Sequence, residues 1–320
     1  MVSGSWRALF SFDDIRGESE ALRQVVWLAR RAAEGGYPTL IVGESGTGKE
    51  LLAHAIHGAS PQRDGPFVAI NCGTLSRDLV VAELCGYEAG AFTGADRHRR
   101  TGLLDAASGG TLFLDELQDM APASQSVLLR FLETQSFVRV GGTRPVTVNV
   151  RVVATLNVTM DEVERAGLVR SDLLYRLNCL TIDIPPLRER RADIVPIAEK
   201  CLREELHFLG EVDDEFWTAL ATCPCSWPGN ARGLRNVLLK AILACSRGRL
   251  SAADLPRGIW DAPATAAGVP HVSPNGRAAD DIVALRAVLR ANRDNVSAAA
   301  RGLGIHRSTV YRRLARGEGS

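Results

Sequence analysis

The sequence predicts an α/β protein in which a mainly parallel sheet, covered by helices on both faces, precedes a small helical subdomain and a separate all-helical end. Apolar, strand-like runs alternate with helical patterns as far as about residue 184, and this alternation is typical of parallel sheets. After Pro185-Pro186 the sequence reads as helical throughout residues 187–255. The last forty residues carry eight arginines and three acidic residues, a net charge of +5 in a chain whose formal total is +1.

The five expected strands are short and apolar, as strands buried on both faces are. They span residues 39–42, 67–70, 111–114, 148–154 and 180–184. The clearest helical periodicity of the following subdomain lies in residues 194–208, 213–222 and 230–246. We therefore expect an N-terminal extension (1–11), a sheet subdomain (12–186), a helical lid (187–258), a linker rich in Pro, Ala and Gly (259–279) and a terminal helical domain (280–320).

Composition and cysteine usage favour a soluble cytoplasmic protein. No apolar run approaches the roughly 20 residues that span a bilayer, and the first residues lack the pattern of a signal peptide. The chain has seven cysteines, an odd number, which does not favour a disulfide framework. We expect reduced thiols in or near the core at positions 72, 85, 179, 201 and 245. Cys223 and Cys225 form a lone C-x-C without a second ligand pair, which does not favour zinc.

A phosphate-binding loop is predicted directly after the first strand. The motif is Gly43-Glu44-Ser45-Gly46-Thr47-Gly48-Lys49, and Glu50 follows it where a helix is expected to begin. Glycines let backbone N–H groups point at phosphate oxygens, the helix N-terminus favours anions, and a lysine reaches the terminal phosphates. Glu50 stands where the generic motif has a hydroxyl that ligates magnesium. This loop, residues 43–49, is called the phosphate loop below.

Two carboxylates end the third predicted strand. Asp115 and Glu116 follow the apolar run 111–114, and the carboxyl ends of strands in open α/β sheets are where ligands bind. We expect Asp115 to help hold Mg²⁺ and Glu116 to polarise an attacking water, because phosphoryl transfer depends on positioning and charge neutralisation. The alternative is that the pair only caps the following helix.

A glycine-flanked hexapeptide lies between these two motifs and carries no catalytic side chain. Its residues are Gly90, Ala91, Phe92, Thr93, Gly94 and Ala95. Glycines allow sharp turns, and a Phe-Thr pair at the tip offers a small amphipathic surface to another protein. The sequence thus predicts a contact loop driven by nucleotide state, with an ordinary glycine-rich turn as the alternative.

The basic end of the chain reads as three helices, residues 281–291, 296–303 and 306–316, with a turn at Gly304-Ile305. Val310 and Leu314 face inward at helical spacing. The residues that remain outward for DNA are His306, Arg307, Ser308, Thr309, Arg312 and Arg313. We expect phosphate contacts from Arg312 and Arg313 and base contacts from the start of the last helix. The alternative is a basic, solvated helical hairpin.

Together with residues 83–88, the hexapeptide resembles the signature loop of the sigma-54-dependent transcriptional activators, which are bacterial enhancer-binding AAA+ ATPases. The resemblance extends over about residues 12–255. It includes Glu50, because the family also has a glutamate directly after the lysine of the phosphate loop. The terminal helices resemble the Fis-type helix-turn-helix of that family. It implies an AAA+ sheet with a helical lid, ATP and Mg²⁺ as cofactors, and a homo-oligomeric ring, a hexamer as in the family. It also implies enhancer DNA and the sigma-54 RNA polymerase holoenzyme as partners.

The resemblance implies roles for five further residues. Asn71 matches the asparagine that holds the catalytic glutamate in an unproductive state, and Asn157 occupies the place of sensor I. Arg170 and Arg176 match two arginines that reach a neighbouring subunit's γ-phosphate, for which surface ion pairs are the alternative. Arg232 matches the sensor II arginine of the lid. Two positions depart from the family pattern: Leu156 replaces Thr, and Gly233 replaces Glu inside a helix, which costs about 1 kcal/mol in helix propensity and is expected to soften the coupling of the lid.

Two hypotheses for the function remain. In the first, ATP hydrolysis drives the hexapeptide against the polymerase and opens a promoter. In the second, the protein is a DNA-binding regulator whose nucleotide domain senses ATP or a ligand without remodelling polymerase. The intact hexapeptide, Glu116, Arg170 and Arg176 favour the first. A third possibility, a helicase loader or chelatase, is disfavoured by the hexapeptide and by the terminal helix-turn-helix. Nothing before Phe12 resembles a sensor, so we expect control by a separate regulatory protein or by an upstream sensor domain.

Overall fold

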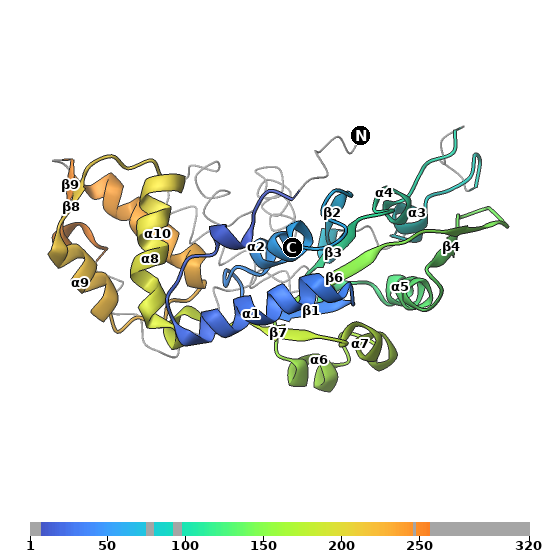
Figure 1. Cartoon of the computed structure of the whole chain (residues 1–320), viewed down its shortest axis with the longest axis horizontal. Coiled ribbons are helices and arrows are strands. Elements are labelled where there is room, and N and C mark those ends of the chain that lie inside the picture. The colour runs from blue at the N-terminus through green and yellow to red at the C-terminus, as the bar shows by residue number, and fades with distance from the viewer. Residues whose placement is uncertain (1–7, 75–79, 92–97, 246–247, 257–320) are drawn as a thin grey trace, which may run out of the picture. The chain divides into compact units, whose positions relative to one another are not determined.

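The computed structural model describes residues 8–74, 80–91, 98–245 and 248–256. Its centre is a five-stranded parallel sheet in the order β2-β3-β6-β1-β7 (Figure 1). The strands are β1 (Thr39–Val42), β2 (Phe67–Asn71), β3 (Thr111–Asp115), β6 (Arg151–Leu156) and β7 (Thr181–Asp183). The prediction of a parallel α/β sheet is confirmed, with strand ends displaced by up to three residues.

The strand register brings the carboxyl ends to one edge of the sheet. Asn71 at the end of β2 pairs with Asp115 at the end of β3, and Val42 at the end of β1 pairs with Leu156 at the end of β6. The phosphate loop leaves β1 at this edge. Residues that are far apart in the sequence therefore meet where parallel sheets bind ligands.

Helices cover both faces of the sheet because successive strand residues point to opposite sides. On one face, Ile41, Phe113 and Val153 pack with α1 (Glu20–Gly35) and α2 (Lys49–Gly58). On the other face, Leu40, Leu112 and their alternate neighbours pack with five helices. These are α3 (Val80–Cys85), α4 (Leu103–Ala106), α5 (Pro122–Thr134), α6 (Met160–Ala166) and α7 (Ser171–Leu177).

Helix α1 is fixed at both ends by side chains from elsewhere in the chain. Ser19 caps its N-terminus, and the fully buried Asp193 accepts hydrogen bonds from the Ser19 amide and hydroxyl, each at 2.7 Å. At its C-terminus the buried Arg151 guanidinium donates to the carbonyls of Ala32 and Ala33. Burial lowers the pKa of Arg151 to about 10, and the carbonyl end of a helix is a favourable place for such a cation.

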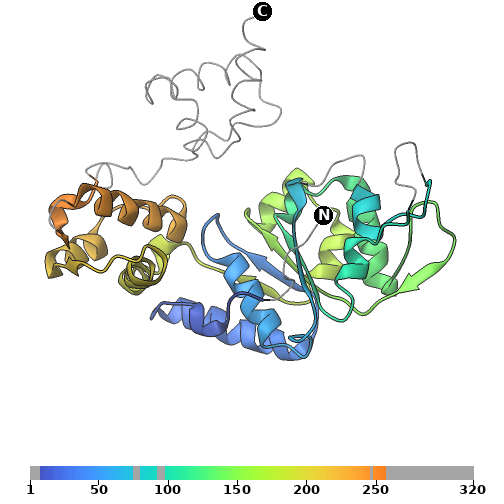
Figure 2. The same ribbon diagram turned by 90° about the horizontal axis from the view of Figure 1, so that it is seen from above.

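A helical lid with its own core follows the sheet (Figure 2). It consists of α8 (Ile194–Lys200), a π-helical turn (Cys201–Glu205), α9 (Asp214–Thr222) and α10 (Asn230–Ala244), packed around the fully buried Trp227 and Phe216. The prediction that residues 187–255 are helical throughout is wrong in detail, because β8 (Glu211–Val212) and β9 (Arg249–Leu250) pair in parallel. Two-residue strands leave no periodicity that a sequence could reveal.

A second feature absent from the sequence prediction is the hairpin of β4 (Ser136–Val138) and β5 (Pro145–Thr147). The cysteines, all of which lie within the described ranges, form no disulfide. Cys72, Cys85 and Cys201 are buried as predicted, and Cys245 is half-buried, but the prediction is wrong for Cys179, which is exposed because it follows the end of α7. No helix within the described ranges is long and apolar enough to cross a membrane.

Several predictions lie outside the described residues. These are the linker, the terminal helical domain with His306, Arg307, Ser308, Thr309, Arg312 and Arg313, and residues 92–95 of the hexapeptide. Gly90 and Ala91 are described, and their surroundings are given below.

Candidate nucleotide site

The phosphate loop requires glycine for two separate reasons. Gly46 and Gly48 have φ values of +78° and +105°, a region that favours glycine. In addition, a Cβ on Gly46 would lie 2.2 Å from the carbonyl oxygen of Gly229 at the start of the lid helix. The Gly46 carbonyl in turn accepts a hydrogen bond from the Ala231 amide at 3.0 Å. The loop therefore presents the N-terminus of α2 as an anion site while it packs against the lid.

Lys49, the first residue of α2, lies inside this loop. Its side chain is buried, and Nζ donates to the carbonyls of Gly43 and Glu44 at 2.6 and 3.0 Å. Burial lowers the pKa of Lys49, and the charges of Asp115 and Glu116 oppose that shift. An enclosed ammonium at the loop facing two carboxylates is the arrangement that a phosphate group with a divalent cation fits.

Thr155 joins the two carboxylate residues at the end of β3. Its fully buried hydroxyl donates to Asp115 Oδ1 at 2.7 Å and accepts from the Glu116 amide at 2.9 Å. Leu156, where the family pattern has Thr, is fully buried in the core on the opposite face of the sheet. Sequence reasoning missed Thr155, for which the only signal was its place beside Leu156.

Glu116 is held by two side-chain amides. Asn71 Nδ2 donates to Glu116 Oε2 at 3.0 Å and Asn157 Nδ2 donates to Oε1 at 3.2 Å. Asn71 also lies 3.4 Å from Asp115 Oδ2. The backbone of Glu116 is left-handed (φ 55°, ψ 55°), a costly conformation for a non-glycine residue that is often found at functional sites. The structure thus brings Asn71, Asn157, Asp115 and Glu116 together.

The lid is tied to the phosphate loop through Glu44. Arg188 makes a two-pronged ion pair with the Glu44 carboxylate, with contacts of 2.7 and 2.9 Å. Asn230 Nδ2 donates to Glu44 Oε2 at 3.2 Å and to the Ser45 carbonyl at 3.0 Å. These contacts, that of Arg188 foremost, lower the pKa of Glu44. Asn230 is fully buried, and it is a second residue whose role the sequence did not reveal.

Arg232 reaches the same loop from α10, since its Nη1 donates to Ser45 Oγ at 3.0 Å. Close packing explains the glycine at the neighbouring position 233, because a Cβ on Gly233 would lie 2.5 Å from the Pro228 carbonyl oxygen. The missing side chain therefore permits a close approach in the turn before α10. Softer coupling of the lid stays a prediction.

Two cavities adjoin the phosphate loop. The larger, of about 530 Å³, is lined by Lys49, Asp115, Glu116 and Arg232, among others. The smaller, of about 140 Å³, is lined mainly by aliphatic side chains, including Ile15, Leu22, Val25 and Ile184. The larger cavity carries basic and acidic side chains together, which suits phosphates with a divalent cation, and the mainly aliphatic one beside it suits the base of a nucleotide.

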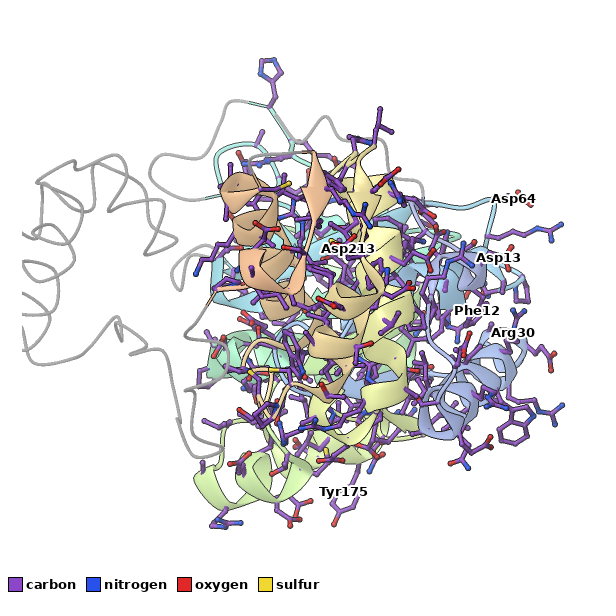
Figure 3. The ribbon with its side chains drawn as sticks, turned by 90° about the vertical axis from the view of Figure 1, so that its left-hand side faces the viewer. Phe12, Asp13, Arg30, Asp64, Tyr175 and Asp213 are labelled. Atoms are coloured by element: carbon purple, nitrogen blue, oxygen red, sulfur yellow. The ribbon has the colours of Figure 1, made fainter. Side chains whose placement is uncertain are left out.

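Arg170 and Arg176 do not line these cavities. Both are exposed on or next to α7, where Arg170 pairs with Asp172 at 2.7 Å and donates to Ser126 Oγ at 3.1 Å. Tyr175, which is 82% exposed, lies between them in sequence and points away from the ribbon in Figure 3. The two arginines therefore belong to an outer surface and not to the nucleotide site of their own chain.

The base of the hexapeptide is pinned to the β4–β5 hairpin. Tyr87 exchanges two backbone hydrogen bonds with Arg100, and the Glu88 amide donates to the Val140 carbonyl, all at 3.0 Å. The backbone of Gly90 is in the left-handed region (φ 72°), which glycine adopts readily. A Cβ on Gly141 would lie 2.8 Å from the Ala91 Cβ, so the hairpin turn contacts the loop closely.

The sheet order, the phosphate loop and the helical lid define a protein of the AAA+ class. Three family models match the chain: the sigma-54 interaction domain over residues 15–183, an AAA+ ATPase lid domain over residues 188–269, and a PucR C-terminal helix-turn-helix domain over residues 282–319. The chain belongs to the family of sigma-54-dependent transcriptional activators. The helix-turn-helix prediction is also confirmed, although the matched model is of the PucR and not the Fis type.

Known relatives agree with this assignment. The chain is 37% identical to the acetoin dehydrogenase operon transcriptional activator AcoR of Bacillus subtilis, over 95% of this chain and 51% of AcoR. It is 46% identical to the sigma54-dependent transcriptional activator SfnR of Pseudomonas putida, over 68% and 59% of the two chains. The chain thus spans about half the length of these relatives.

Solved structures agree as well. NtrX from Brucella abortus in complex with ATP has a TM-score of 0.67 at 31% identity, over 96% of this chain and 69% of NtrX. The Thermotoga maritima RuvB branch migration motor shares the fold, with a TM-score of 0.53 at 16% identity, over 94% and 87% of the two chains.

Replacing Thr155 by Val is expected to destabilise the site, because the Glu116 amide and Asp115 Oδ1 would each lose a partner. The free energy of unfolding, measured by urea denaturation, should fall by about 1–3 kcal/mol. Thr218→Val is the matched control, since the Thr218 hydroxyl is exposed and bonds only within its own helix, to the Asp214 carbonyl. Equal losses in the two variants would contradict the bridging role of Thr155.

Proposed function

We propose that this chain hydrolyses ATP between neighbouring subunits and uses the hydrolysis to remodel the sigma-54 RNA polymerase holoenzyme at promoters. The observation that carries the proposal is the position of Glu116, which is held by Asn71 and Asn157 at the sheet edge that also carries Lys49 and Asp115. Membership of the sigma-54 activator family supports it. The complex of its relative NtrX with ATP supports the choice of nucleotide.

Each group at the edge has a task in this proposal. The backbone amides of residues 43–49 and of Glu50 bind the phosphates together with the Lys49 side chain, and Arg232 approaches them from the lid. Asp115 would hold Mg²⁺, which when bound neutralises charge on the phosphates. Glu116 polarises the attacking water once it leaves Asn71, and Asn157 senses the phosphate end. The hydrogen bond from Asn71 to Glu116 therefore keeps the site idle until nucleotide and neighbour are in place.

Arg170 and Arg176 complete the site of the next subunit. Their exposure, and their absence from the two cavities beside the phosphate loop of their own chain, support a role across a subunit boundary. A planar, permanently charged guanidinium suits the stabilisation of transition-state charge. A closed ring, which we take to be a hexamer, gives every site such a neighbour.

Contact with the polymerase, DNA binding and control of the ATPase involve other parts of the protein. Residues 90–95 contact sigma-54, with their base fixed by Arg100 and the β4–β5 hairpin. Residues 280–320 bind enhancer DNA, and a regulatory protein or sensor domain controls the ATPase. The competing hypothesis is a nucleotide sensor that never remodels polymerase. It requires the same ATP site, and it differs because residues 90–95 would not act on sigma-54.

Mixing two inactive variants tests the shared site. Arg170→Ala should lower ATP turnover on the order of 10³-fold, and Glu116→Ala should also be inactive. Rings that contain both variants should regain part of the turnover, because an interface can combine an intact Glu116 with an intact neighbouring Arg170.

The control mixes Arg170→Ala with Arg176→Ala, which should regain nothing because both arginines come from the same subunit. If the first mixture stays inactive at every ratio while rings assemble, the arginines do not act across subunits.

Thr93→Ala separates the motor from the sensor. Thr93 lies far in sequence from Lys49, Asp115 and Glu116, so the variant should keep ATP turnover and DNA binding. It should lose ATP-dependent open-complex formation at a sigma-54 promoter, which is the quantity to measure, while Thr101→Ala, an exposed threonine outside the hexapeptide, should keep it. Open complexes formed by Thr93→Ala at the normal rate would refute the role of the loop, and failure of the unmutated protein under every activating condition would favour the sensor.

A further inference from the structure

The two cavities beside the phosphate loop meet at a short boundary. Five residues line both: Gly48, Leu51, Ile197, Glu205 and Ala231. Four of these have no polar side-chain atom. Among the described residues, Glu205 is therefore the only one that places a hydrogen-bonding side chain at the boundary.

A change in helix geometry brings Glu205 to this boundary. Helix α8 is regular as far as Lys200 and then widens into the π-helical turn Cys201–Glu205, with a hydrogen bond of 2.9 Å from the Leu206 amide to the Cys201 carbonyl. This π-turn ends the helix, as π-turns at helix C-termini do, because the residues after Glu205 are not helical. Cys201 and Glu205, at the two ends of the turn, both line the larger cavity.

The Glu205 carboxylate is anchored from the facing lid helix. Arg235 Nε on α10 donates to Glu205 Oε2 at 3.1 Å, and the Cys201 thiol donates to the same oxygen at 3.7 Å. Both contacts use Oε2, so Oε1 keeps its capacity to accept further hydrogen bonds. Arg235 lies one turn after Arg232 and lines the same cavity. The carboxylate is thus held in place at the point where the cavities join.

We propose that the Glu205 carboxylate accepts a hydrogen bond from the ribose of the bound nucleotide and thereby makes the site selective for ribonucleotides. The inference rests on the proposed function, in which the phosphates lie at Lys49 and the base lies in the apolar cavity. A nucleotide runs from base through ribose to phosphate, so the ribose crosses the boundary. Its 2′- and 3′-hydroxyls are donors, and a carboxylate is a strong acceptor for them.

The test compares ADP, 2′-deoxy-ADP and 3′-deoxy-ADP, none of which is consumed during a titration. Isothermal titration calorimetry of the full chain should show ADP bound about tenfold more tightly than at least one deoxy analogue, the loss expected from one hydrogen bond to a charged group. Glu205→Ala should weaken ADP about tenfold and leave the affinity for that analogue unchanged. Glu205→Gln keeps the shape and one acceptor, and should show intermediate selectivity.

Glu204→Ala is the matched control, because Glu204 is the adjacent carboxylate, pairs with Lys200, and lines neither cavity. It should keep the full selectivity. Equal affinity of the unmutated chain for all three nucleotides would overturn the ribose proposal and leave the nucleotide site standing. Selectivity that survives in Glu205→Ala would overturn it too. Absence of any ADP binding by the folded chain would instead overturn the proposed function.

Discussion

One buried side chain, Asn230, joins three segments on which the nucleotide site depends. Its Oδ1 accepts from the Leu187 amide at 2.7 Å, where the chain leaves the sheet, and its Nδ2 donates to Ser45 and Glu44 in the phosphate loop. Asn230 begins α10 in a left-handed conformation (φ 52°), which asparagine tolerates better than most residues. The packing of Gly46 against Gly229 completes the joint. The lid and the loop are therefore one structural unit.

In the proposed function, nucleotide state has two physical routes through the molecule. On the lid side, Arg232 on α10 contacts Ser45 of the phosphate loop and is placed by the same turn that docks on the loop. On the sheet side, Asn71 ends β2, and the chain from there leads through α3 to Gly86 and Tyr87 at the base of the hexapeptide. A contact between Asn71 and Glu116 that differs between nucleotide states would bias the start of that segment. Both routes begin at the edge where the strands end.

The sequence was sufficient for the parts of the site that sit in strong local patterns. Alternating apolar runs predicted the sheet, and the motifs around Lys49, Asp115 and Glu116 predicted its functional edge. Thr155, Asn230 and Glu205 could not be found in this way, because their importance comes from partners 39 to 186 positions away or from a helix that widens locally. The β4–β5 hairpin and the β8–β9 pair were missed because strands of two or three residues have no measurable period. The exposure of Cys179 depends on where α7 ends, which is among the least certain features of a sequence prediction.

The most direct test of this account is the dissociation constant of ADP for Asn230→Ala, compared with Asn236→Ala, an exposed asparagine on the same helix. Loss of the Asn230 amide removes the hydrogen bonds that hold the Ser45 carbonyl, Glu44 and Leu187 in place. We expect the affinity of Asn230→Ala for ADP to fall at least about tenfold and that of Asn236→Ala to stay unchanged. An unaltered dissociation constant in folded Asn230→Ala protein would contradict the claim that the lid and the phosphate loop act as one unit.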